Sequence, residues 1–196
     1  MDRTDVKENR TTTRTTAAER KTEVAVLAGG CFWGVDDILR DVPGVIDTDV
    51  GYTGGWLENP TYDDTHDSKS GHAESVRVTF DPSVLSYEDL LEQWFFRLHD
   101  PTTLNRQGND VGTQYRSGIY WHDEAQKPVI ERVLAEANAA LGGRVVTEVK
   151  PVSNYSAAEA YHQHYFAQHP NQGYCAAVIG PKVEKFRKVF RERLVA

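Results

Sequence analysis

Apolar and polar positions alternate along several short stretches of this chain, and other stretches repeat at helical spacing. Runs rich in β-branched residues predict five strands, at 23–28, 45–52, 73–80, 117–121 and 145–150. Segments with helical periodicity predict five helices, at 33–41, 86–98, 124–141, 156–168 and 181–194. The sequence shows no internal repeat, so this mixed order predicts one domain that combines α and β structure.

Two of the helix starts carry the signal of a capping box, in which a hydroxyl is followed three residues later by an acid. These pairs are Ser86 with Asp89 and Ser156 with Glu159. Long polar loops separate some of the elements, at 53–72 and at about 99–116. Because loops of this length are unusual in a compact domain without a function, we expect functional residues in both.

The first 21 residues are rich in threonine and charge and contain almost no large apolar side chain. Such a segment cannot offset the entropy of ordering, so we expect a disordered tail at 1–21 and a single catalytic domain at 22–196. The net charge of −7 argues against nucleic acid or an anionic membrane surface as a partner. Because we find no secretory apolar region, no membrane-spanning run and no coiled-coil pattern, we expect a cytoplasmic monomer.

The most unusual residue in its surroundings is Cys31, which lies in the sequence GGCFWG at 29–34. A predicted strand precedes it and a short predicted helix follows it. Backbone N–H groups at the start of a helix favour a thiolate over a thiol, and the thiolate is the nucleophile. Phe32 and Trp33 could form the wall of an apolar pocket beside the sulfur. A buried structural cysteine is the alternative, but the glycine and aromatic residues favour a reactive one.

Cys175 is the other cysteine of the chain, and it follows a turn of asparagine, glycine and proline residues. The turn could carry Cys175 toward another sulfur, or the thiol could be buried at the start of the apolar run 176–179. The residues alone leave open whether the two cysteines are independent thiols or a catalytic pair.

A candidate acid lies at the start of the strand predicted at 73–80. Period-two alternation sets Glu74 on the same face as Val76, Val78 and Phe80. A carboxyl at the mouth of an apolar face is partly desolvated, which raises its pKa and keeps it protonated near neutral pH. Glu74 could therefore donate a proton as a general acid, although a frayed, solvated strand end is the alternative.

The long loops add tyrosines, whose hydroxyls are neutral hydrogen-bond donors. Tyr62 lies in the first loop, and Tyr115 lies in the second together with Asp110. The histidines at 162, 164 and 169 with Cys175 suggest zinc, but His162 and His164 are two positions apart and no CxxC pair accompanies them. We therefore expect no metal.

Seven short blocks in this order closely resemble the class A peptide methionine sulfoxide reductases. They are GCFWG (30–34), GYTGG (51–55), NPTY (59–62), GHAE (71–74), QGND (107–110), GTQYRS (112–117) and YHQ (161–163). The resemblance spans about 22–180 and implies an α+β fold, a two-layer sandwich with a ferredoxin-like core and long covering loops. It also implies that the chain needs no cofactor of its own.

The resemblance further implies a role for each candidate residue. Cys31 matches the nucleophile that attacks the sulfoxide sulfur and becomes a sulfenic acid, and Glu74 matches the acid that protonates the oxygen. Cys175 matches a resolving cysteine that forms a disulfide with Cys31, which thioredoxin then reduces. The substrate-binding matches are Phe32 and Trp33 for the methyl group, Tyr62 and Tyr115 for the oxygen, and Asp110 for the polar side of the site.

Implied partners are thioredoxin as reductant and methionine S-sulfoxide, free or in oxidised proteins under repair. Two other functions compete with this interpretation. A thiol peroxidase also passes through a sulfenic acid, but peroxide has no methyl group that an aromatic pocket would bind. A non-catalytic redox-sensing or peptide-binding module would keep the fold, but it would have no need of Cys31, Glu74 and Cys175 together.

Overall fold

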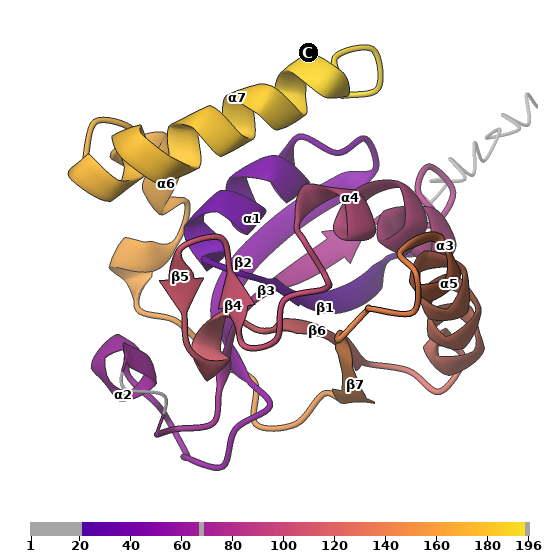
Figure 1. Cartoon of the computed structure of the whole chain (residues 1–196), viewed down its shortest axis with the longest axis horizontal. Helices are drawn as coiled ribbons and strands as arrows, with labels where there is room; N and C mark the ends of the chain where they lie inside the picture. The colour runs from indigo at the N-terminus through magenta and orange to yellow at the C-terminus, as the bar shows by residue number, and fades with distance from the viewer. Residues whose placement is uncertain (1–20, 67–68, 195–196) are drawn as a thin grey trace, which may run out of the picture.

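The computed structural model describes residues 21–66 and 69–194, and the tail expected at 1–21 lies outside them except for Lys21. A six-stranded sheet runs through the centre in the order β7-β6-β1-β3-β2-β8. Figure 1 labels the strands from β7 to β2. The pairs are antiparallel except β6 with β7, which are parallel. The strands are β1 (Glu23–Gly29), β2 (Val45–Thr53), β3 (Ala73–Phe80), β6 (Ser117–Trp121), β7 (Glu148–Pro151) and β8 (Ser156–Ala157). A small separate ladder joins β4 (Arg106–Gln107) to β5 (Asp110–Val111).

The four central strands have the order β6-β1-β3-β2, with α1 between β1 and β2 and a helical segment between β3 and β6. This is the β-α-β-β-α-β arrangement of a ferredoxin-like core. The longer helices are α1 (Phe32–Arg40), α5 (Gln126–Ala140) and α7 (Gly180–Val189). The shorter ones are α2 (Tyr62–His66), α3 (Tyr87–Asp89), η1 (Leu90–Phe95), α4 (Phe96–Leu98), η2 (Thr113–Tyr115), η3 (Ala160–His162), α6 (Tyr165–Gln168) and η4 (Cys175–Ile179).

The principal core lies between one face of the sheet and the helices. Buried side chains of α1, such as Ile38, pack with those of β3 and α7, such as Val78 and Val183. A smaller cluster around Val26 and Tyr120 covers the other face. Alternation along β3 produces this division, because Val76, Val78 and Phe80 enter the principal core. The α+β sandwich predicted from the sequence is therefore confirmed.

The individual elements agree with the sequence except near the C-terminus. All five predicted strands form, with the last shifted to 148–151. The capping box at Ser86 is confirmed, because Asp89 N–H donates to Ser86 Oγ at 3.0 Å. The helix predicted at 156–168 is wrong: Ser156 pairs with Tyr52 in the sheet, and regular helix occupies only α6. The last helix begins earlier than expected and ends at Val189.

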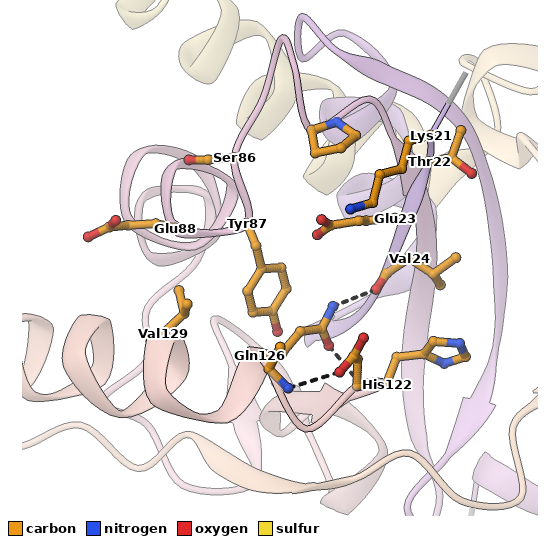
Figure 2. Close-up of a pocket in the computed structure, with 13 residues that line it drawn as sticks. Lys21, Thr22, Glu23, Val24, Ser86, Tyr87, Glu88, His122, Gln126 and Val129 are labelled. Atoms are coloured by element: carbon orange, nitrogen blue, oxygen red, sulfur yellow. Dashed lines mark hydrogen bonds between the residues drawn. The ribbon is translucent and has the colours of Figure 1, made fainter. Parts of the chain in front are cut away.

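A cavity of about 630 Å³ lies at the start of β1, the opposite end of that strand from Cys31. Figure 2 shows how Gln126, at the start of α5, crosses it to reach the sheet. Gln126 Nε2 donates to the Val24 carbonyl at 2.8 Å, and Gln126 Oε1 accepts from His122 N–H at 2.8 Å. Helix α5 is thereby fixed to the edge of the core, away from the candidate catalytic residues.

Candidate active site

The candidate nucleophile lies in the turn between β1 and α1, as the sequence predicts. Cys31 is the N-cap residue of α1, and its carbonyl accepts from Gly34 N–H at 3.2 Å. The turn requires glycine at position 30, because its φ is +98° and a Cβ there would lie 2.7 Å from Gln107 Cγ. The turn therefore brings the second long loop against the thiol.

The thiolate expected for Cys31 is not the favoured form in this structure. Backbone N–H groups of Trp33 and Gly34 lower the pKa of the thiol, as a helix N-terminus should. Burial raises that pKa by more, and the carboxylates of Glu74 and Asp110 raise it further, so the pKa lies well above its ordinary value. The prediction of a resting thiolate is wrong because the sequence pattern shows the helix but not the surrounding groups that desolvate this partly exposed residue.

The candidate acid behaves as the alternation of β3 predicts. Glu74 is 2 % exposed, and its Oε1 accepts from Phe32 N–H at 3.1 Å. This bond holds the carboxyl against the residue that follows Cys31. Burial, with a smaller contribution from Asp110, raises the pKa of Glu74 to about 8 even though the Phe32 N–H opposes the shift. At neutral pH the group is therefore mostly protonated and can donate.

Aromatic rings enclose one side of the site. The Phe32 ring is buried and stacks on Tyr62 with 6.4 Å between ring centroids. Trp33 stacks on Tyr165 at 4.0 Å and also faces Tyr62 at 6.4 Å. The first long loop, which carries Tyr62 on α2, thus lies against the two residues that follow the thiol. These rings form a largely apolar wall suited to a methyl or thioether group.

His162 and Glu159 hold this aromatic wall in place, a role that the sequence did not predict for either residue. His162 Nδ1 accepts from Trp33 Nε1 at 2.9 Å, and burial lowers the pKa of this imidazole. Glu159, predicted to cap a helix, instead accepts from Tyr52 Oη at 3.1 Å and Tyr62 N–H at 3.4 Å. The sequence signals are the YHQ block at 161–163, which contains His162, and the spacing from Ser156, which pointed to Glu159 but as a helix cap.

The polar side of the site comes from the second long loop. Tyr115 ends η2. Burial is the largest cause that raises the pKa of its hydroxyl, and the negative charges that Glu74 and Cys31 can carry raise it further. Burial and the same two groups raise the pKa of Tyr62. Both hydroxyls therefore stay neutral and can donate hydrogen bonds. Asp110 accepts from the hydroxyl of Tyr174, a residue that the sequence analysis did not select.

A cavity of about 150 Å³ opens at the thiol, and we call it the Cys31 cavity. Asp110 and Tyr174 line it together with Lys182 of α7. Cys175 follows Tyr174 directly, is fully buried, and begins the π-helical turn η4. Both cysteines are free thiols and pack in the same core cluster. The residue before Cys175 therefore lines the cavity at Cys31, and no disulfide joins the two cysteines.

Arg116, from the GTQYRS block, ties the loops of the site together. Its guanidinium donates to the carbonyls of Thr113 and Gly71, both at 2.9 Å. It also pairs with Glu148 Oε2 at 2.8 Å. The loop before Glu74 and the turn that carries Tyr115 are thereby joined through one side chain. The sequence motif includes this arginine but does not reveal its partners.

The histidines considered for zinc have other contacts. His162 is bonded to Trp33, and His164 Nδ1 lies 3.2 Å from Asp36 Oδ2. Within 21–66 and 69–194, no group of three histidine, cysteine or acidic side chains is arranged to hold a metal ion. Over the same residues, none of the helices is both long enough and apolar enough to cross a bilayer.

A partly exposed thiol, a buried neutral carboxyl and an aromatic wall on an α+β sandwich define a thiol-dependent oxidoreductase. The sequence model of the peptide methionine sulfoxide reductase family matches residues 23–194. The MsrA protein of Saccharolobus solfataricus is 49% identical over 172 residues, which are 88% of this chain and 97% of that protein. The chain thus belongs to the peptide methionine sulfoxide reductase family, class A, and carries out thiol-dependent reduction of methionine sulfoxide.

Solved structures agree with this assignment. The reduced form of Mxr1 from Saccharomyces cerevisiae superposes with a TM-score of 0.74 at 32% identity, over 82% of this chain and 92% of that one. Methionine sulfoxide reductase A of Corynebacterium diphtheriae gives a TM-score of 0.69 at 36% identity, over 77% of this chain and 76% of that one. The structure of Mxr1 in complex with Trx2 gives a TM-score of 0.52 at 26% identity, over 78% of this chain and 91% of that one.

Proposed function

We propose that this chain reduces the S epimer of methionine sulfoxide with Cys31 as the nucleophile and Glu74 as the acid. The observation that supports this most strongly is the 3.1 Å bond from Phe32 N–H to Glu74, which sets a neutral carboxyl beside the thiol-bearing turn. A sulfoxide is polarised, with positive charge on sulfur and negative charge on oxygen. A nucleophile for the sulfur and a proton donor for the oxygen are therefore both needed.

The reaction can be written so that atoms and electrons balance. The Cys31 sulfur attacks the sulfoxide sulfur while Glu74 gives its proton to the oxygen. The S–O bond of the substrate then breaks as the oxygen bonds to the Cys31 sulfur, the transient bond between the two sulfurs breaks, and methionine leaves as the thioether, so that Cys31 is left as a sulfenic acid. The proton lost by the thiol returns to Glu74, so the carboxyl is neutral again. The sulfoxide sulfur is reduced by two electrons and the cysteine sulfur is oxidised by two.

Tyr62 and Tyr115 would hold the sulfoxide oxygen, since both hydroxyls remain neutral donors. Phe32 and Trp33 would receive the methyl group on the aromatic wall. Asp110 would organise the polar side through its bond from Tyr174, because that contact joins the second loop to the segment that leads to Cys175. Phe32, Trp33 and Tyr62 belong to the aromatic wall and Asp110 lines the Cys31 cavity, while Tyr115 is linked to the site by its electrostatic coupling to Glu74 and Cys31.

Cys175 would resolve the sulfenic acid: its sulfur bonds to Cys31 and water leaves. Cys175 is fully buried at the start of η4 and forms no bond with Cys31, so the turn that precedes it must rearrange before the sulfurs meet. One of the contacts that such a rearrangement would break is the bond from Cys175 N–H to Gln172 Oε1 at 2.9 Å. Thioredoxin would then reduce the disulfide by thiol exchange, a proposal supported by the solved complex of yeast Mxr1 with Trx2.

The proposed setting follows from this chemistry. Both thiols must be kept reduced between turnovers, which suits the cytoplasm, where thioredoxin keeps cysteines reduced. Substrates would be free methionine sulfoxide or oxidised side chains of damaged proteins. We propose that residues 22–196 form one catalytic domain, preceded by a disordered tail at 1–21, and that the protein works as a monomer.

The two cysteine roles are tested by Cys31→Ser and Cys175→Ser with separated R and S sulfoxide peptides. Cys31→Ser should lose turnover by at least about a thousandfold, because the nucleophile is gone. Cys175→Ser should release one methionine per enzyme from the S peptide and then stop with thioredoxin, holding a sulfenic acid that mass spectrometry detects. Normal thioredoxin turnover by Cys175→Ser would contradict its role. Faster turnover of hydrogen peroxide than of the S peptide would favour the thiol peroxidase.

A further inference from the structure

One lysine of helix α7 lines the same cavity as the thiol. Lys182 lines the Cys31 cavity together with Cys31 and Asp110. It also lines a neighbouring cavity of about 580 Å³ with His99 and Gln107. Its side chain therefore lies between the two cavities. Within residues 21–66 and 69–194, Lys182 has no hydrogen bond or ion pair that would hold its ammonium elsewhere.

The groups that face the Cys31 sulfur are otherwise anionic or neutral. Lys182 is the one cationic side chain among the described residues that line the Cys31 cavity. The acids and tyrosines come from five different segments. They are Glu74 of β3, Asp110 of β5, Tyr62 of α2, Tyr115 of η2 and Tyr174 before η4.

The electrostatic link between the lysine and the thiol runs in both directions. Burial lowers the pKa of Lys182, while the negative charges of Cys31 and Asp110 raise it. Coupling between two titrating sites is reciprocal, so the Lys182 charge favours ionisation of Cys31 by the same free energy. His99 lies on the far side of the lysine, and the Lys182 charge helps to lower the pKa of that imidazole after burial, which is the largest cause.

We propose that Lys182 is a positioning residue for the reaction, whose ammonium stabilises the Cys31 thiolate as it forms. This inference rests on the proposed role of Cys31 as nucleophile. It answers a problem that the site poses, because burial, Asp110 and any negative charge that Glu74 carries oppose the charge that the attacking sulfur must carry. The backbone N–H groups at the start of α1 are too weak to offset that opposition alone. The ammonium supplies the missing positive charge from the lining of the same cavity.

The test measures ionisation of Cys31 directly, apart from turnover. The full-length protein is treated with iodoacetamide at pH 8, and mass spectrometry follows labelling of the Cys31 and Cys175 peptides. At a pH below the thiol pKa, the labelling rate is proportional to the thiolate fraction. Lys182→Met should slow Cys31 labelling by about tenfold, which corresponds to a pKa rise of about one unit. Lys182→Arg, which restores the charge, should recover most of the rate.

The matched control is Lys185→Met, one turn further along α7, which removes an exposed charge that does not line the Cys31 cavity. It should label at the wild-type rate. An unchanged Cys31 rate in Lys182→Met, or no recovery in Lys182→Arg, would overturn the inference. Increased Cys175 labelling in Lys182→Met would reveal loosened packing and also count against it. Failure of Cys31 as nucleophile is a separate result, since it appears as retained turnover in Cys31→Ser.

Discussion

Glu74 and Glu148 are two glutamates of the same sheet whose carboxyls have opposite environments. Glu74 is enclosed by apolar residues and receives a single backbone N–H, and its pKa is raised to about 8. Burial also opposes the charge on Glu148, but Lys150, Arg116 and Tyr120 all bond to it and bring its pKa down to about 2. Partners rather than burial alone therefore decide which carboxyl is an acid at neutral pH and which is a fixed anion.

The two glutamates consequently give stability opposite dependences on pH. The folded pKa of Glu74 lies above its ordinary value of 4.5, so its contribution is fully present below pH 4.5 and is lost as pH rises through about 8. The folded pKa of Glu148 lies below that value, so its contribution is present above pH 4.5 and is lost as pH falls toward about 2. The site thus gives up some stability between about pH 4.5 and 8 because Glu74 is buried beside the thiol.

Glu74→Gln removes the proposed catalytic acid and should have the largest effect. The amide still accepts from Phe32 N–H but has no acidic proton, so kcat/KM for an S-sulfoxide peptide at pH 7 should fall by about 100- to 10,000-fold. Glu88→Gln is the control, because it alters an exposed carboxyl that pairs with Arg132. A loss of less than threefold in Glu74→Gln would contradict the role of Glu74.

Arg116→Met tests the structural glutamate, because it removes the guanidinium that pairs with Glu148. It leaves Glu148 without its guanidinium partner and frees the carbonyls of Gly71 and Thr113, so the free energy of unfolding at pH 7 should fall by about 2–4 kcal/mol. Denaturant titration measures this loss. The control Lys150→Met removes an exposed partner of the same carboxyl and should lower stability by less than about 1 kcal/mol. Equal effects of the two variants would show that burial of Arg116 adds nothing.

The sequence anticipated what local pattern controls. Alternation along β3 predicted the buried face of Glu74, and the glycines at 29 and 30 predicted the turn at Cys31. The ionisation of Cys31 was predicted wrongly, because enclosure by distant segments outweighs the helix terminus. Glu159 was predicted as a cap because its spacing from Ser156 fits one, yet its contacts are with Tyr52 and Tyr62, about a hundred residues away in sequence.

Residues with a purely tertiary role had no such signal. Arg116 and His162 lie inside recognisable blocks, but their partners are distant in the chain and no spacing rule identifies them. Lys182 falls in a charged helix where most lysines are solvated, and only the packing of α7 against the thiol turn distinguishes it. Roles that depend on long-range contacts therefore require the folded structure.

The central claim is that a neutral carboxyl adjoins the nucleophilic thiol at physiological pH. The most direct measurement is the titration of Glu74 itself, by carboxyl ¹³C NMR of labelled protein from pH 4 to 10, with Glu74→Gln used to assign the signal. The account predicts a midpoint near 8, as burial of the carboxyl requires. A midpoint near the ordinary value of 4.5 would mean that Glu74 is a carboxylate at neutral pH and could not be the acid.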